Sequence, residues 1–222
     1  MNDQDLKQAF EDFISSNRFP CVGAKSALVR DNIVMTVAED IDRPTSDLEI
    51  HEAIRAFHEE LDLESPVVQS LAILFKGPRE LGENDFENAL WDRLQCLHNL
   101  DVATGEIWNP DVANDPNDAH FSMSLCGEPF FVVGLHPNAS RPARRFDYPV
   151  LVFNSHRQFE KLRADGRFEK MKQVIRERDR ELAGSINPML DDFGGSSEAR
   201  QYSGRTVDND WKCPFSYKEG AA

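Results

Sequence analysis

Residues 121–137 read FSMSLCGEPFFVVGLHP, and this stretch indicates the fold more clearly than any other part of the chain. It contains two apolar runs, Phe121–Leu125 and Phe130–Leu135, with a short turn sequence between them. Short apolar runs bounded by turn residues are typical of buried β-strands. We therefore predict two neighbouring strands, with His136 at the end of the second strand and Pro137 ending its ladder of hydrogen bonds.

The rest of the chain predicts helices on either side of these strands. Apolar residues recur at helical spacing in residues 6–14, 48–61, 86–97 and 159–182, the last segment being interrupted near Asp165 and Gly166. Ser46 and Glu49 form the pattern of a capping box before the second helix. Further strands are predicted at residues 33–37, 67–75 and 150–154. The order of these elements predicts an α+β fold in which helices cover a central mixed or antiparallel sheet.

The last forty residues differ from the rest. After Ala183, glycines and prolines interrupt the sequence, and no helical or strand periodicity is visible. The segment nevertheless contains large apolar side chains, including Phe193, Trp211 and Phe215, which are unsuited to a solvated tail. We therefore predict that residues 183–222 form an ordered but irregular cap. A length of 222 residues fits one domain, so residues 1–222 are predicted to form a single domain.

The charge balance excludes several classes of partner. With 39 acidic and 25 basic residues, the chain has a formal net charge of −14. A protein with this charge is repelled by nucleic-acid phosphates and by anionic membranes, so we expect neither as a partner.

No apolar run predicts a transmembrane helix, and the first residues lack the features of a signal peptide. The four cysteines contain no Cys-x-x-Cys pair, which fits neither a disulfide framework nor a zinc ribbon. We therefore expect a cytoplasmic protein.

Familiar motifs for nucleotide binding and hydrolysis are absent. No Gly-x-Gly-x-x-Gly, Walker or Gly-x-Ser-x-Gly sequence occurs. His51 and His58 lie seven residues apart on one face of a predicted helix, where they could bind a metal ion. The glutamates beside them favour the simpler interpretation that both histidines are solvated.

The densest group of candidate functional residues follows the strand at 130–135. His136 is followed within ten positions by Arg141, Arg144 and Arg145, in a chain of strongly negative charge. One interpretation is a buried histidine with arginines that pair with local acidic groups. The other is an imidazole ligand beside an anion-binding cluster, because guanidinium groups donate paired hydrogen bonds to carboxylates and phosphates. The spacing alone leaves both interpretations open.

The predicted cap contains a second group of candidates. Asp191, Asp192 and Glu198 could bind a cationic substrate, although a solvated acidic turn is the simpler interpretation. Cys213 lies before a proline and between aromatic residues. It could be a thiolate ligand, whereas the commoner role of such a residue is that of a buried, unreactive thiol.

At these positions the sequence resembles the YqcI/YcgG family. The resemblance extends over nearly the whole chain, and its C-terminal motifs are long enough to be specific. The motifs are FPCVGAK at residues 19–25, HPNASRPARRF at 136–146, VFNSH at 152–156, IRERD at 175–179, GSINPML at 184–190, EARQYSGR at 198–205 and WKCPF at 211–215.

The resemblance implies a function. Family members with known activity are heme-dependent N-oxygenases, which hydroxylate a guanidine nitrogen of arginine in cycloserine biosynthesis or of a cyclic guanidine in guanitoxin biosynthesis. It therefore implies a monooxygenase that uses heme b, O₂ and electrons from a separate reductase or ferredoxin. The implied substrate is a small guanidine or amine compound, and residues 183–222 are expected to cover the heme pocket.

The candidate residues can be assigned to the needs of such a site, which are an axial ligand, cations for the propionates and apolar walls. We predict His136 as the axial ligand, with His156 and Cys213 as alternatives. The predicted partners of the propionates are Arg141, Arg144 and Arg145. The predicted ligands of the substrate guanidinium are Asp191, Asp192 and Glu198. Two other functions stay open: a heme-binding or gas-sensing protein without turnover, and a heme-free protein that binds a small anion.

Overall fold

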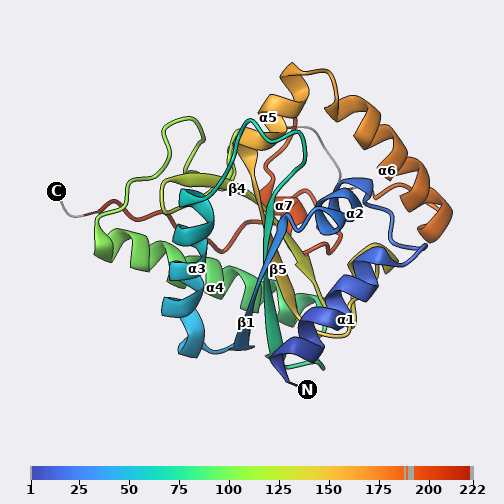
Figure 1. Cartoon of the computed structure of the whole chain (residues 1–222). Coiled ribbons are helices and arrows are strands. Elements are labelled where there is room, and N and C mark those ends of the chain that lie inside the picture. The colour runs from blue at the N-terminus through green and yellow to red at the C-terminus, as the bar shows by residue number, and fades with distance from the viewer. Residues whose placement is uncertain (1, 188, 190–192, 221–222) are drawn as a thin grey trace.

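A computed structural model of the chain describes residues 2–187, 189 and 193–220. At its centre is a five-stranded sheet with helices on both faces (Figure 1). The strand order is β1 (Ile33–Asp40), β2 (Ser70–Gly77), β5 (Val150–Ser155), β4 (Glu128–Leu135) and β3 (Met123–Leu125). Strands β1 and β2 are parallel, whereas the other neighbouring pairs are antiparallel. The structure thus confirms the predicted α+β fold with a mixed sheet.

The helices form a layer on each face of the sheet (Figure 1). One layer contains α3 (Asp47–Glu59) and α4 (Glu83–Thr104). The other contains α1 (Asp3–Ser15), α2 (Val22–Val29) and α6 (Phe168–Ala183). Helix α5 (His156–Ala164) follows β5 directly, and a short α7 (Ala199–Tyr202) lies in the C-terminal segment. Among the helices that the structure describes, none combines the length and apolar character that crossing a membrane requires.

The strands separate two apolar cores. Successive residues of a strand point to opposite faces of a sheet. In β4, Phe130 and Val132 belong to the core beneath α3 and α4, whereas Val133 and Leu135 belong to the core beneath α1. From Val132 to Leu135, neighbouring positions of β4 therefore serve different cores, and this alternation decides which residues can reach a site on either face.

Helix α2 is not predicted by the sequence pattern, because its residues VGAKSALV are mostly small and show no polar face. Cys21 precedes the helix, and its Sγ accepts a hydrogen bond from the backbone N–H of Ala24 at 3.4 Å. A Cβ atom on Gly23 would lie 3.1 Å from Sδ of Met171 in α6. Small residues give the helix no apolar periodicity by which the sequence could predict it. The same small residues let the helix pack closely against α6.

The predicted capping box at Ser46 is wrong. Ser46 does precede α3, but its side chain makes no hydrogen bond to the first turn of that helix. Its Oγ instead accepts a hydrogen bond from the backbone N–H of Glu39 at 3.1 Å. Ser46 therefore connects the start of the helix to β1, a long-range contact that a local sequence pattern does not reveal.

The C-terminal segment is largely irregular, as predicted, and it is anchored on the sheet. The hydroxyl group of Tyr202 accepts a hydrogen bond from the N–H of Met123 (3.1 Å) and donates one to the carbonyl of Phe130 (3.0 Å). Further along, Trp211 and Phe215 pack against Trp91 of α4. The described part of this segment thus reaches both the edge of the sheet and the α4 layer.

Gly134 marks the closest approach of β4 to α4. A Cβ atom at this position would lie 2.7 Å from Cε1 of Phe86 and 2.9 Å from Cδ1 of Leu90, and both of these side chains are fully buried. We expect Gly134→Ala to lower the free energy of unfolding by about 1–3 kcal/mol, as overpacked cores do. Urea unfolding measures the difference. Gly220→Ala, whose added methyl group meets only one backbone atom at 4.0 Å, serves as the control, and equal effects of the two substitutions would contradict this packing.

Candidate functional site

A cavity of about 340 Å³ lies on the sheet face that α1, α2 and α6 cover. Its apolar lining includes Phe19, Phe131, Val133, Phe159, Met171 and Ile175. Pockets that bind small molecules have volumes of about 300–1,000 Å³ and are mostly apolar with a few polar groups. The cavity has this character, and a few polar side chains face it.

His156 is the imidazole on the cavity wall. It is the first residue of α5, and Ser155 before it caps the helix by accepting a hydrogen bond from the N–H of Gln158. The ring is buried and lies against the ring of Phe193, with 4.2 Å between the centroids. Its Nε2 is 3.5 Å from Oε1 of Glu160. The end of β5 and the start of α5 therefore fix the imidazole at the cavity.

Glu198 is the buried carboxylate beside this imidazole. Its Oε1 lies 3.7 Å from Nδ1 of His156, and the side chain also lines the cavity. Among the described residues, its Oε2 has no hydrogen-bond partner, although it is shielded from solvent. A buried carboxylate oxygen without a partner is costly unless a ligand supplies the donor. This oxygen is therefore a sign that the cavity binds a ligand with a hydrogen-bond donor.

Arg144 is a buried cation at the cavity. It donates hydrogen bonds to three backbone carbonyls, those of Gly134 (2.9 Å), Gln201 (3.3 Å) and Tyr202 (3.3 Å). Burial lowers the pKa of its guanidinium group to about 10. The side chain remains charged at neutral pH and gives this wall a positive charge.

The other two arginines of the predicted cluster have protein partners. Arg141 is paired with Asp179 of α6 and also donates to the carbonyl of Ser185 at 2.9 Å. Arg145 donates to the carbonyls of Ala139 (3.0 Å) and Ser140. Of the three, only Arg144 lines the cavity, where the other cationic lining residues are Arg163, Lys172 and Arg176.

A thiol for which the sequence predicts no role also lines the cavity. Cys21, before α2, lines the cavity, and burial raises the pKa of its thiol. Its place within the FPCVGAK motif is the sequence feature that could have marked Cys21 as a candidate site residue. Cys213, by contrast, is absent from the cavity lining and packs against the core beneath α3 and α4, where burial raises the pKa of its thiol to about 12.

His136 lies outside the cavity. It continues the even-numbered positions of β4, and its ring stacks on Phe86 of α4 with 4.3 Å between the centroids. Within the described chain, its Nδ1 is buried and has no hydrogen-bond partner. The structure therefore places the ring of His136 against α4, outside the cavity that Glu198 and His156 line.

The burial of His136 predicts a pH dependence of stability. Burial lowers the pKa of its imidazole from 6.5 to about 4. Between these values the unfolded chain binds a proton that the folded chain does not, so stability falls as the pH falls. From pH 7 to pH 5 this loss amounts to roughly 2 kcal/mol. We expect His136→Gln to lose correspondingly less stability over this range in urea unfolding; an unchanged pH dependence would contradict the burial of a neutral imidazole.

The remaining candidates fall into two groups. Asp191 and Asp192 lie outside the described residues. His51 and His58 are on α3, on the sheet face away from the cavity. The interpretation of His51 as solvated is wrong, because the side chain is buried and its Nε2 lies 2.6 Å from Oδ1 of Asp101. His58 is partly exposed, and its Nδ1 lies 3.5 Å from Oε2 of the buried Glu128.

Comparison with known proteins places the chain in a family. The sequence model of the YqcI/YcgG family matches residues 10–216. The uncharacterized protein YqcI of Bacillus subtilis (strain 168) is 26% identical over 209 residues, covering 90% of this chain and 81% of that protein. The uncharacterized protein YcgG of the same organism is 28% identical over 214 residues, covering 91% and 82%. No solved structure matches the chain. Because the family match includes nearly every element described above, the chain belongs to the YqcI/YcgG family.

Proposed function

We propose that the protein is a heme-dependent monooxygenase that N-hydroxylates a small guanidine or amine compound. The observation that carries the proposal is the buried Oε2 of Glu198, which lines the cavity and has no hydrogen-bond partner among the described residues. A guanidinium group has the donors and the positive charge that this oxygen lacks. The resemblance to N-oxygenases of the same family supports the reaction.

The residues around the cavity fit a heme group. Heme iron is commonly bound by a histidine or a cysteine thiolate. His156 is the imidazole at this cavity, and we propose it as the axial ligand in place of His136, which lies on the other face. The apolar lining suits the macrocycle. We propose Arg144 and Arg163 for the propionates because both line the cavity, although Arg144 also donates to backbone carbonyls and Arg163 is also paired with Glu160. Arg141 and Arg145 do not belong to the cavity lining.

The roles of the chain's own residues follow from their positions. Glu198 binds and orients the substrate guanidinium at the cavity. The aromatic wall, including Phe193 and Phe159, excludes water from the substrate nitrogen, which strengthens the ion pair with Glu198. Arg144 adds a fixed positive charge near any bound anionic group. When bound, heme supplies the reductive activation of O₂.

The electrons come from outside the protein. The sequence contains no flavin or nicotinamide fingerprint, so we propose a separate reductase or ferredoxin as the donor. We place the reaction in the cytoplasm, which agrees with four cysteines that form no disulfide in the structure. Neither a nucleic acid nor a membrane is proposed as a partner, because of the net charge of −14.

Absorbance spectroscopy of the full chain, expressed with added heme precursor, tests the proposal. We expect a stoichiometric heme spectrum that changes when L-arginine or another guanidine is added. With O₂ and a ferredoxin and its reductase, mass spectrometry should detect a product that has gained one oxygen atom on nitrogen. Heme without a substrate-induced change would indicate a sensor or carrier, and absence of heme would indicate the anion-binding alternative; either result would overturn the proposal.

A further inference from the structure

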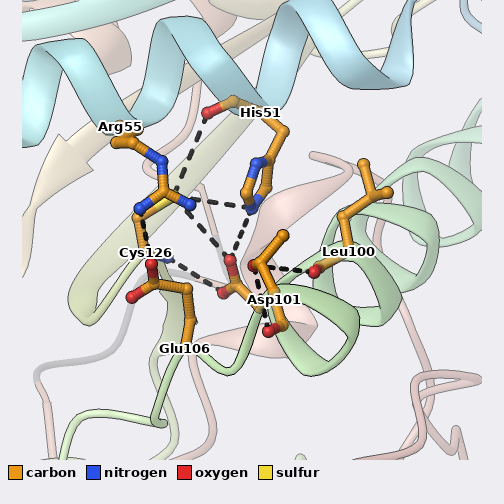
Figure 2. Close-up of polar contacts among 7 residues, drawn as sticks. His51, Arg55, Leu100, Asp101, Glu106 and Cys126 are labelled. Atoms are coloured by element: carbon orange, nitrogen blue, oxygen red, sulfur yellow. Dashed lines mark hydrogen bonds and ion pairs between the residues drawn. The ribbon is translucent and has the colours of Figure 1, made fainter.

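A second cluster of chemically versatile side chains lies on the opposite face of the sheet. It contains His51 of α3, Asp101 in the last turn of α4 and Cys126 in the turn between β3 and β4 (Figure 2). All three residues are buried, with about 5% of each exposed. Because they come from three separate elements, their meeting is a product of the tertiary fold rather than of local sequence.

The three donor atoms converge on one point. The Nε2 atom of His51 is 2.6 Å from Oδ1 of Asp101 and 3.6 Å from Sγ of Cys126, and the sulfur is 3.7 Å from the same oxygen. In a catalytic Cys–His–Asp arrangement, the thiol and the carboxylate contact different ring nitrogens, so that the imidazole can relay a proton. Here they face the same nitrogen. This geometry does not suit a relay and instead resembles a chelating site.

The spacing can be compared with that of a tetrahedral zinc site. Bonds of about 2.3 Å to sulfur, 2.05 Å to nitrogen and 2.1 Å to oxygen give ligand separations of about 3.6 Å from sulfur and about 3.4 Å between nitrogen and oxygen. The two separations that involve Cys126 already have this length. Only the pair His51 and Asp101, now joined by a hydrogen bond, must move apart by about 0.8 Å when a cation replaces the shared proton.

The surroundings hold the ligands in place. The backbone N–H of Cys126 donates to Oδ2 of Asp101 at 2.9 Å, which leaves Oδ1 to face the cluster. Cys126 has a positive φ of 50°, followed by Gly127 at 76°, so a tight turn presents the thiol. Asp101 lies at the C-terminal end of α4, where the helix dipole favours a cation.

The charges of the cluster also balance. A thiolate and a carboxylate together neutralise a divalent cation, and a neutral imidazole completes the set. Nearby, Arg55 donates to Glu106 at 2.5 Å, so these two side chains neutralise each other (Figure 2). One sulfur, one nitrogen and one oxygen donor suit a borderline-soft ion such as Zn²⁺ better than Mg²⁺ or Ca²⁺, which prefer oxygen.

We propose that His51, Asp101 and Cys126 form a Zn²⁺ site that is separate from the cavity and independent of heme. With three protein ligands, the fourth position is left to water. The site would join α3, α4 and the β3–β4 turn.

Cobalt substitution tests this site. The full chain, produced without added heme and freed of metal by a chelator, is titrated with Co²⁺. We expect one equivalent to produce a thiolate-to-cobalt charge-transfer band and tetrahedral d–d bands, and Zn²⁺ to displace both. We expect Cys126→Ser and His51→Gln to weaken Co²⁺ binding by about a hundredfold or more, whereas Cys213→Ser, another largely buried thiol, keeps the wild-type spectrum.

Several outcomes would overturn the proposal. These are a wild-type titration without a charge-transfer band, a band that persists in Cys126→Ser, and a band that disappears in Cys213→Ser instead. If Cys126→Ser does not fold, His51→Gln decides, because glutamine keeps a hydrogen-bonding side chain but removes the imidazole. Heme takes no part in the Co²⁺ titration. Failure of the Zn²⁺ site can therefore be distinguished from failure of the proposed monooxygenase function.

Discussion

Replacing Glu198 with glutamine is expected to reduce the affinity of the heme-loaded protein for a guanidine ligand such as L-arginine by more than a hundredfold. The side chain is 6% exposed, and its Oε2 lacks a partner among the described residues. A guanidinium bound there forms a buried ion pair, and removal of one partner from such a pair costs about 3–5 kcal/mol. Isothermal titration calorimetry measures the change, and absorbance checks that the variant still contains heme.

Glu160→Gln is the matched control for this prediction. Glu160 approaches the same histidine, at 3.5 Å from its Nε2, but half of its side chain is exposed to solvent. We expect this substitution to change guanidine affinity by less than about fivefold, since exposed ion pairs contribute at most about 1 kcal/mol. Asp191→Asn and Asp192→Asn test the other two predicted carboxylates. If either of them abolishes binding while Glu198→Gln binds like the wild type, Glu198 is not the recognition residue.

The sequence predicts most of the elements because their apolar patterns are strong. The strands around Phe130–Leu135 and Val150–Asn154 and the break between α5 and α6 all occur close to the predicted positions. Helix α2 escapes prediction because close packing against α6 requires small residues, which carry no periodic signal. The capping box at Ser46 fails because a strand residue competes successfully for the serine hydroxyl.

The candidate site is harder to predict because it depends on which face of the sheet is hollow. Both faces of β4 are apolar, so the sequence does not reveal that Val133 borders a cavity whereas Phe130 borders a filled core. Leu135 lines the cavity, whereas His136, the next residue in the chain, stacks on Phe86 outside it. The cluster at His51 is hidden for a similar reason, since its partners lie 50 and 75 residues away in the chain.

Substitution of His156 is expected to have the largest effect on heme binding. We expect His156→Ala to lose heme during purification, or to retain it with an altered ferrous–CO spectrum, because the cavity loses its imidazole. The wild-type ferrous–CO complex should have a Soret band in the globin-like range that is typical of an imidazole ligand. Added free imidazole should partly restore this spectrum in His156→Ala, since the substitution leaves space at the cavity wall.

His136→Gln and Cys21→Ser separate the alternatives to His156. His136 stacks on Phe86 beyond the sheet, so its substitution should leave the heme spectrum unchanged. Cys21 lines the cavity, but burial raises the pKa of its thiol and thus disfavours the thiolate that iron would require. A globin-like spectrum that survives in His156→Ala but disappears in His136→Gln would return the ligand to His136. A strongly red-shifted CO complex that disappears in Cys21→Ser would show thiolate ligation, and the same result in Cys213→Ser would place the heme on the α4 side of the sheet.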